Sequence, residues 1–455
     1  MKSNTCRFLR QSALAAAIAG ISAPASAAFF QIAENNASGI GNAYAGGAAI
    51  AEDASTVWYN PAGMTRFTRP QFVIAGHFID PSFKATVNSA TAAAALGGAS
   101  FGVGGGQAGE SALVPNLYYT HPITSSFSLG AGINAPFGLA TEYDSTWGGR
   151  YHAVRSDIKT VNVNFAGAYK FNEVLSGGVG VNYQKVDAEL TQGVDFASIC
   201  NAAGAGGICG GTAGTNDGNA KVTADSTAWG YNLGLLLQPD KDVRVGIAYR
   251  SKMVHSLSGD FDITAPGNVP GAVLNAPTIR LVDSGAKADV TLPATFSLSA
   301  YRQIDSQWAV MADLTRTFWS TLPELRIKFD SGQGDSVVTL NLVDTNRLSF
   351  GMTYKPNDPW VLRGGLAVDQ SPVPNSSDRT PRLPDAERTW YALGAGFQSS
   401  PALTFDFGYV YVKVNDSTVT KTAGGPGTEN FLRGNLNASY TGSVQILSAQ
   451  ARWSF

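Results

Sequence analysis

The sequence predicts an all-β protein: a transmembrane antiparallel β-barrel of fourteen strands, plugged by an N-terminal hatch domain. Three observations predict this fold class. Apolar and polar residues alternate along most of the chain, as in strands with one apolar and one polar face. Charged residues make up only 15% of the 455 residues, where a soluble domain carries roughly 25%. The chain also begins with an export signal and ends on an aromatic residue, Phe455.

The balance of 32 basic and 34 acidic residues argues against a nucleic-acid-binding protein. A nucleic-acid-binding protein needs a basic face, and a net charge of −2 does not supply one. The high apolar and aromatic content also excludes a disordered chain. We therefore expect no nucleic acid among the partners.

The first 27 residues have the layout of a secretory signal peptide. Lys2, Arg7 and Arg10 precede an apolar run over residues 13–21, and an A-x-A cleavage site follows over residues 25–27. The alternative is a membrane anchor, but the run is shorter than the roughly 20 residues that a spanning helix needs. The sequence therefore predicts a signal peptide over residues 1–27 that is cleaved during export.

Residues 28–66 are the one segment that does not alternate. They contain many small residues, a short helix-like piece over residues 45–53 and a turn at Asn60-Pro61. One interpretation is a flexible periplasmic tail. The aromatic residues favour a plug folded into the lumen, because a solvated tail would be more polar. We predict a hatch over residues 28–66 and a transmembrane β-barrel over residues 67–455.

The alternation in the barrel region divides into fourteen predicted strands. They lie near residues 70–82, 113–122, 127–137, 155–171, 174–190, 226–238, 241–261, 287–304, 306–320, 345–356, 359–370, 387–398, 402–415 and 440–455. A soluble β-sandwich would alternate too. The strand lengths, the aromatic residues near strand ends and the even count favour a bacterial barrel. Such a sheet must close, because lipid leaves no partner for an unpaired edge.

No pattern in the sequence indicates catalysis or a resident metal. Cys200 and Cys209 are the two cysteines left after export, and we expect them to pair in an oxidising compartment. A metal site is the rival interpretation, but no histidine or acidic residue lies between them. The G-x-S-x-G sequence at residues 98–102 lies in a glycine-rich loop without the strand–turn–helix frame of a nucleophile elbow. We predict no enzyme activity, no catalytic residue, no metal and no cofactor.

The hatch sequence resembles that of a known family. The resemblance rests on this set of residues: Phe30-Gln31, Ser38-Gly39, Gly41, Ala43-Tyr44, Gly46, Ala49-Ile50-Ala51, Asp53-Ala54, Val57 and Asn60-Pro61-Ala62. It continues over residues 78–81, 137–143, 369–374 and 383–388 and so covers nearly the whole exported chain. In these residues the protein resembles the long-chain fatty acid transporter family of outer-membrane proteins.

The resemblance implies a mechanism and a set of site residues. Family members are monomeric barrels in the outer membrane, among its lipids, that take up a hydrophobic small molecule. External loops catch the ligand, a luminal pocket receives it, and movement of the hatch opens a lateral exit beside a kinked third strand. Phe30 matches the hatch position that reaches the pocket, and its neighbours Phe29 and Gln31 are candidates for the same pocket. Asn60, Pro61 and Ala62 match the hinge region of the hatch.

The end of the third predicted strand offers a local reason for such an exit. Pro136 cannot donate a hydrogen bond to a neighbouring strand, and Gly132 weakens the strand before it. With Phe137 and Gly138 these residues are the candidates for a kink that forms a lateral gate. The alternative is an ordinary strand end at a turn.

The ligand is left open between two chemical classes. In fatty-acid carriers of the family, two basic pocket residues face the carboxylate. This sequence has Thr191-Gln192 and Thr339-Leu340 at those positions. The resemblance therefore implies either a carrier of long-chain fatty acids or a relative that admits neutral aromatic hydrocarbons. More distant alternatives are a diffusion porin and an outer-membrane lipid hydrolase.

Overall fold

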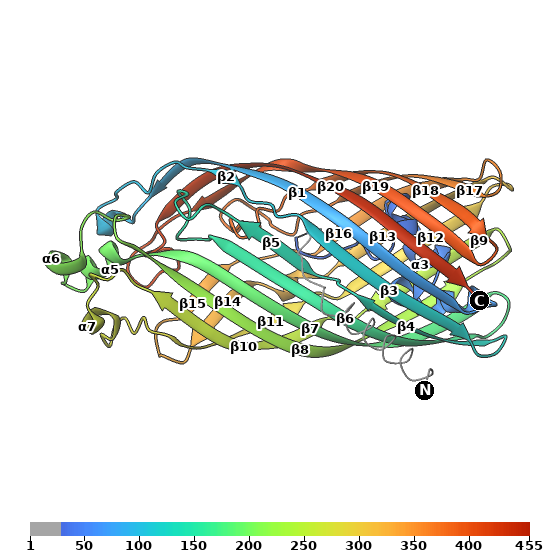
Figure 1. Cartoon of the computed structure of the whole chain (residues 1–455), viewed down its shortest axis with the longest axis horizontal. Helices are drawn as coiled ribbons and strands as arrows, with labels where there is room; N and C mark the ends of the chain where they lie inside the picture. Colours follow the sequence, from blue (N-terminus) through green and yellow to red (C-terminus); the bar gives the residue numbers. More distant parts are fainter. Residues whose placement is uncertain (1–28) are drawn as a thin grey trace, which may run out of the picture.

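The computed structural model describes residues 29–455 and forms a closed, fourteen-stranded antiparallel β-barrel (Figure 1). The first strand, β1 (Gln71–Thr91), pairs with the last, β20 (Asn435–Ser454), from Gln71 opposite Ser454 to Thr91 opposite Asn435. This pairing closes the sheet and confirms the predicted fold class. The predicted signal peptide lies outside the described residues.

The fourteen strands follow one another around the barrel, and three of them are broken into two pieces. In order the strands are β1, β3 (Ala112–Pro122), β4 (Phe127–Asn134) with β5 (Gly138–Glu142), β6 (Arg155–Lys170), β7 (Leu175–Asp195), β8 (Asp217–Leu237), β9 (Val243–Arg250) with β10 (Met253–Thr264), β11 (Ser284–Leu292) with β12 (Thr295–Gln303), β13 (Trp308–Thr317), β16 (Thr345–Tyr354), β17 (Trp360–Asp369), β18 (Arg388–Ser400), β19 (Leu403–Lys421) and β20. Each of the fourteen predicted strands overlaps one of these.

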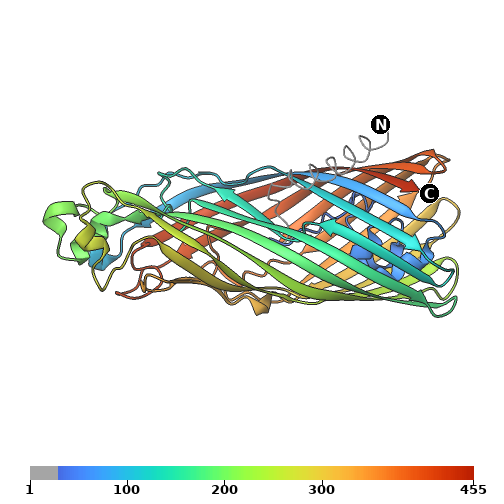
Figure 2. The same ribbon diagram turned by 60° about the horizontal axis from the view of Figure 1, so that its bottom comes forward.

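One end of the barrel carries short turns and the C-terminus, and the other carries long loops (Figure 1). The strands tilt strongly against the long axis (Figure 2). Several reach further toward the long loops than the alternation predicts: β1 runs to Thr91 rather than residue 82, and β8 begins at Asp217 rather than residue 226.

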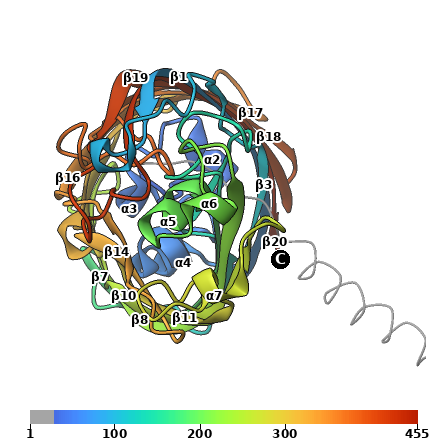
Figure 3. The same ribbon diagram turned by 90° about the vertical axis from the view of Figure 1, so that its left-hand side faces the viewer.

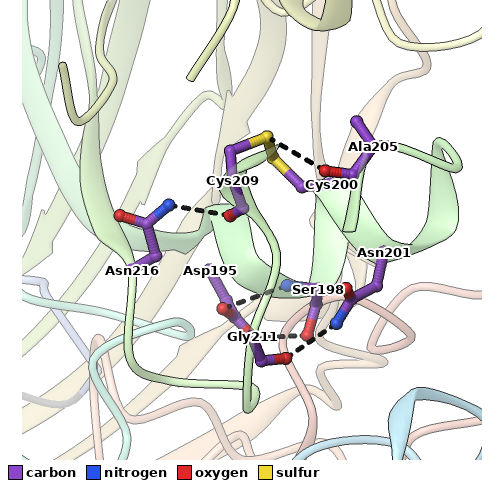
Figure 4. Close-up of a disulfide and its surroundings, with 8 residues drawn as sticks. All are labelled: Asp195, Ser198, Cys200, Asn201, Ala205, Cys209, Gly211 and Asn216. Atoms are coloured by element: carbon purple, nitrogen blue, oxygen red, sulfur yellow. Dashed lines mark hydrogen bonds between the residues drawn. A yellow bond between two sulfur atoms is a disulfide. The ribbon is translucent and has the colours of Figure 1, made fainter. Parts of the chain in front are cut away.

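The long-loop end has structure of its own. It consists of β2 (Gly106–Gln107), the hairpin β14 (Glu324–Phe329) with β15 (Ser336–Thr339), the helices α5 (Phe196–Ala202), α6 (Gly206–Cys209) and α7 (Gly271–Leu274), and the 3-10 turns η2 (Ala94–Leu96) and η3 (Trp319–Thr321). A disulfide joins Cys200 in α5 to Cys209 in α6, with their Cα atoms 5.7 Å apart (Figure 4). None of the helices in residues 29–455 is long and apolar enough to cross a membrane.

Apolar side chains cover the outside of the wall. Phe165, Leu348 and Leu393 are each more than half exposed, which in water would be costly for large apolar side chains. Near the short turns, aromatic rings meet across strands, such as Trp308 with Tyr354, whose centroids are 4.3 Å apart, and Trp360 with Phe397 at 4.8 Å. An apolar band bordered by aromatic rings is the surface that a bilayer requires.

Residues 29–66, which we call the hatch, lie inside the barrel (Figure 3), toward its short-turn end (Figure 2). They form α2 (Ala37–Ile40), α3 (Gly47–Ile50), α4 (Thr56–Tyr59) and the 3-10 turn η1 (Pro61–Arg66). The helix expected over residues 45–53 is only the four residues of α3. Gly46 (φ 74°) and Ala51 (φ 44°) flank it in the left-handed region and end it on both sides.

Candidate functional site: the hatch, the luminal cluster and the break in the wall

Glycines on the inner wall let the hatch backbone approach the strands closely. A β-carbon on Gly246 would lie 1.9 Å from the carbonyl oxygen of Ala48, and one on Gly365 would lie 2.2 Å from the carbonyl carbon of Asn42. No side chain fits at such distances. The inward glycines therefore form the seat of the hatch.

Arginines of the wall hold the hatch by its carbonyl oxygens. The contacts are Arg347 Nη2 to Ala43 O (2.7 Å), Arg244 Nε to Ala49 O (3.1 Å), Arg452 Nη1 to Glu52 O (2.8 Å) and Arg250 Nη2 to Trp58 O. Arg363 adds an ion pair with Glu52, at 2.5 Å, and a second with Asp406 of the wall, at 2.9 Å. These are charge-assisted hydrogen bonds, which are about twice as strong as neutral ones. They hold the hatch against the strands at four points between Ala43 and Trp58.

The Asn60-Pro61-Ala62 turn is a second anchor. The Asn60 side chain donates to Ala48 O (2.7 Å) within the hatch and to Leu235 O (2.9 Å) on β8. Its oxygen accepts from the backbone N–H of Ala62 (3.1 Å) and so begins η1, with Pro61 at the first position. These three predicted residues lie together, where the hatch meets the wall.

Glu34 is a buried acidic residue in the hatch. Its side chain has no exposed surface, and both carboxyl oxygens lack a hydrogen-bond partner among the described residues. Burial raises the pKa of Glu34 to about 7, against the smaller lowering effects of the nearby backbone N–H groups of Glu34 and Ala33 and of the positive charges of Arg347 and Arg388. A neutral carboxyl is therefore the form that suits this position at mildly acidic pH.

The start of the hatch lies in an apolar cluster near the middle of the lumen. Phe29 and Phe30 each have their ring centroid 5.1 Å from that of Trp319, and Phe30 lies 5.7 Å from Phe137. The luminal cluster consists of these four rings with Leu139, Val186, Ala228, Met253, Leu257, Leu292, Leu322, Leu340, Leu342, Val373 and Leu383. The predicted pocket residues Phe29 and Phe30 thus fill an apolar space built by strands and loops.

The wall has a break between β3 and β5. Pairing of β3 with β4 extends only from Leu117 to Pro122 on β3. Beyond Asn134 the third strand is interrupted, and it resumes as β5 at Gly138, paired with β6 alone among the named strands. Pro136 and Phe137 lie in this interruption. Gly132 lies outside it, in the regular ladder between Tyr118 and Asn164.

The start of the hatch closes this break with backbone hydrogen bonds. The N–H of Gly138 donates to Phe30 O (2.9 Å), and the N–H of Ile32 donates to Pro136 O (2.8 Å). Gln31 lies between them, in an antiparallel bridge with Phe137. The predicted pocket residues and three of the four predicted gate residues are therefore one constellation. Phe30 packs in the luminal cluster, and the next residue, Gln31, pairs with Phe137 at the break.

Apart from the luminal cluster, a cavity lies between the hatch and strands β8, β9, β12 and β13. It encloses roughly 950 Å³ of empty space, part of which is open to solvent. Its lining includes Arg250, Asp313, Arg347 and Asp369. The lining also includes apolar and aromatic side chains, among them Trp58, Leu233 and Tyr249, so charged and apolar groups share this cavity.

Arg382 and Glu429 were absent from the residues that the sequence predicted. Gln192 accepts a hydrogen bond from Arg382 (2.9 Å), which is 190 residues away along the chain. Thr339 donates from its hydroxyl to Glu429 (2.6 Å), which is 90 residues away. Trp319 also went unrecognised, because the alternation placed it inside a strand. No local signal indicates partners that distant loops supply.

Comparison with known proteins agrees with this architecture. The model of the outer membrane protein transport protein family (OMPP1/FadL/TodX) matches residues 18–455. Outer membrane protein P1 of Haemophilus influenzae is 33% identical over 460 residues, which cover 95% of each chain. The long-chain fatty acid transport protein of Escherichia coli is 32% identical over 426 residues, 89% of this chain and 93% of that one.

The architecture is shared with a solved structure as well. The crystal structure of a Pseudomonas aeruginosa FadL homologue has a TM-score of 0.85 and 27% sequence identity, and the match covers 94% of this chain and 100% of that one. The chain therefore belongs to the OMPP1/FadL/TodX family of outer-membrane proteins, which transport hydrophobic compounds.

Proposed function

We propose that this protein imports long-chain fatty acids or similar hydrophobic compounds and releases them sideways through the break between β3 and β5. One observation carries the proposal: the segment that fills the luminal cluster also closes the break. Phe30 places its ring in the cluster, and its carbonyl oxygen accepts the hydrogen bond from Gly138. A molecule that takes the place of the ring cannot leave this hydrogen bond undisturbed.

The energies favour such an exchange. Freeing the start of the hatch breaks two backbone hydrogen bonds, each worth on the order of 1 kcal/mol. It also takes Phe29 and Phe30 out of buried positions, at a cost of roughly 1.5–3 kcal/mol for each ring that becomes exposed. A hydrocarbon chain that enters the luminal cluster gains about 0.8 kcal/mol for each methylene group that it buries. A chain that buries about ten methylene groups therefore offsets the cost of displacing Phe29 and Phe30. Anchors further along the hatch, such as Asn60, stay in place.

A lateral exit suits an apolar ligand better than an axial one. An axial path toward the short turns leads past Arg250, Asp313 and Arg347, which line the cavity beside the hatch, and an apolar chain there would displace water from these charged groups. The break instead opens toward the apolar outer surface of the wall. A ligand that leaves there passes from one apolar environment to another with little exposed area.

Uptake by whole cells tests the proposal. Cells that lack the protein should take up dilute oleate more slowly than cells that carry it. The Phe30→Ala variant should reduce uptake several-fold, because a smaller side chain no longer links occupancy of the cluster to the break. The matched control is Phe165→Ala, which removes an exposed ring from the outer wall. Equal uptake with and without the protein would refute the proposal.

A neutral aromatic hydrocarbon is the second candidate ligand. One observation favours it. The segments Thr191-Gln192 and Thr339-Leu340 carry uncharged side chains, where the resemblance to fatty-acid carriers implies basic ones. Faster uptake of an alkylbenzene than of oleate, in cells that carry the protein, would support this candidate.

A further inference from the structure

The wall has a second interruption, between β8 and the β9–β10 strand. β8 pairs with β9 over residues 232–237 and with β10 over residues 219–225. Between these two ladders, residues 226–231 of β8 face residues 251–257 without regular pairing. We call this stretch the β8–β10 gap.

The strands on both sides of the gap are otherwise ordered. β8 stays paired with β7 throughout residues 226–231, and β10 stays paired with β11 over residues 253–257. At the short-turn end of the gap, the Ser251 N–H donates to Tyr231 O (2.9 Å). An unpaired edge within a membrane-spanning wall is costly, because lipid offers no hydrogen-bond partner. The gap is therefore a local feature of the wall and not the frayed end of a strand.

The inner side of the gap opens on the luminal cluster. Ala228 on β8 and Met253 and Leu257 on β10 are buried members of that cluster. A β-carbon on Gly230 would lie 2.8 Å from Cε of Met253, so the Met253 side chain reaches across the gap to β8. Methionine is unbranched and has three rotatable bonds, so it fills irregular spaces and adapts to new neighbours. Met253 is therefore suited to fill the gap and to move aside.

The outer side of the gap lies at the edge of the apolar band nearest the long loops. Trp229 on β8 and Val254 on β10 are 70% and 55% exposed there. Further toward the long loops the outer surface becomes polar, where Ser256 donates to Asp289 (2.7 Å). The long loops of outer-membrane barrels face the outside of the cell. The gap therefore opens toward the outer leaflet of the membrane.

The gap is lined by uncharged groups. Among residues 226–231 and 251–257, only Lys252 carries a fixed charge, and its side chain is exposed. His255 is buried, and its Nε2 forms a hydrogen bond with Oε1 of Gln184 on β7 (3.0 Å), on the luminal side of β8. A carboxylate that entered such a lining would lose its hydration without gaining a partner. The lining therefore suits a neutral molecule.

The gap can open without movement of the hatch. The side chains that fill it, Met253 and His255, belong to the wall. The break between β3 and β5 is different, because Phe30 and Ile32 of the hatch close it. A molecule can therefore reach the luminal cluster through the gap while the hatch still closes the break.

We propose that the β8–β10 gap is an inlet through which neutral hydrocarbons dissolved in the outer leaflet enter the luminal cluster. The inference rests on the proposed function and adds a route to it. A neutral hydrocarbon enters sideways at the gap and leaves sideways at the break, so it stays in apolar surroundings throughout. A fatty acid, whose charged head favours water, enters from the long-loop end.

A disulfide across the gap tests the inference in whole cells. Cγ of Met253 lies 3.3 Å from a β-carbon placed on residue 230, which is close enough for cysteines at the two positions to bond. Oxidation of the Gly230→Cys/Met253→Cys variant should slow the uptake of radiolabelled dodecylbenzene several-fold and leave the uptake of radiolabelled oleate unchanged. Reduction should restore the uptake of dodecylbenzene.

The matched control is the Leu233→Cys/Tyr249→Cys variant. These two residues face each other in the regular ladder next to the gap, so a disulfide there closes no opening. Uptake of both probes by this variant should be the same under oxidising and reducing conditions. The reducing agent also acts on the bond between Cys200 and Cys209, and the control shares that change.

A second variant keeps the inference testable if the double cysteine variant does not assemble. Met253→Ala removes the side chain that fills the gap, so dodecylbenzene uptake should rise several-fold while oleate uptake stays unchanged. Heat-modifiable migration in gels shows whether each variant barrel is folded. Unchanged or slower dodecylbenzene uptake by Met253→Ala would count against the inlet.

The two probes separate the inlet from the proposed function. Full dodecylbenzene uptake by the oxidised Gly230→Cys/Met253→Cys variant, or an equal loss of both probes, would overturn the inlet and leave the proposed function intact. Wild-type uptake of oleate alone would overturn it as well. If the wild-type protein speeds the uptake of neither probe, the proposed function is refuted, and the inlet with it.

Discussion

At the scale of single residues, close backbone approach and buried charge hold the hatch in different ways. The inward glycines provide space, so any side chain at these positions pushes the hatch away. The wall arginines provide attraction, and each can be weakened without a clash. Glu34 belongs to neither group, since its carboxyl is buried without a hydrogen-bond partner among the described residues. Each kind of contact therefore predicts a different response to substitution.

The Gly246→Val variant should displace the hatch without unfolding the barrel. Its side chain would overlap the backbone of α3 at Ala48, and overpacking of this kind costs roughly 1–3 kcal/mol. Ion conductance in planar bilayers should rise as the lumen opens. Gly76→Val is the matched control, because nothing lies within 4 Å of a β-carbon at Gly76. Unchanged conductance for Gly246→Val would contradict the close contact between β9 and the hatch backbone at Ala48.

Glu34 should make the stability of the protein depend on pH. Its pKa is raised from 4.5 to about 7 in the folded protein, so the folded state binds the proton more tightly than the unfolded state. The stabilisation is complete below about pH 4.5, falls as the pH rises to about 7 and is constant above that; the change is about 3 kcal/mol. Glu34→Gln should remove this dependence.

Thermal unfolding in detergent at pH 5 and pH 8 measures the effect. The unfolding temperature of the wild type should fall between these two values by more than that of Glu34→Gln. An equal fall in both proteins would show that Glu34 does not titrate in this range.

At the scale of elements, sequence alternation was enough to place all fourteen strands, because each strand has one lipid face and one luminal face. It could not show where strands continue beyond the bilayer, as β8 does before residue 226, since water on both sides removes the alternation. The β14–β15 hairpin was also missed, although Leu325, Ile327 and Phe329 alternate with Arg326 and Lys328 there. The break was predicted in part: Pro136 marks it from the sequence, but the hydrogen bond from Ile32 that closes it depends on the tertiary fold.

The Pro136→Ala variant tests the role of the break as an element of the wall. Alanine supplies the backbone donor that proline lacks, so the third strand can pair more continuously with its neighbours. Oleate uptake should decrease several-fold while barrel assembly stays normal. Pro122→Ala, at the short-turn end of β3, is the control and should leave uptake unchanged. Normal uptake by Pro136→Ala would show that the proline is only a strand end.

At the scale of the whole molecule, the low charge content reflects a barrel with its apolar side facing outward. The wall meets lipid, while polar side chains face the lumen and hold the hatch. Several inward glycines of the strands, such as Gly246, Gly365 and Gly408, make room for the hatch. A barrel whose lumen is filled by a hatch should also conduct fewer ions than an open diffusion porin.

Conductance distinguishes these two kinds of barrel. The wild-type protein should show almost no steady current in planar bilayers, because the hatch fills the lumen. Deletion of residues 29–66 should raise the current, since it empties the space inside the wall. A large, steady wild-type current would favour the diffusion porin instead.

The central claim is that the start of the hatch must leave the break before a ligand can pass. A disulfide across the Gln31–Phe137 bridge tests it most directly, because residues that face each other in such a bridge have β-carbons about 5 Å apart. We predict that the Gln31→Cys/Phe137→Cys variant loses oleate uptake when oxidised and regains it on reduction. Each single cysteine variant should show the same uptake under oxidising and reducing conditions, because it cannot form the bond. Full uptake by the oxidised double variant would contradict the claim.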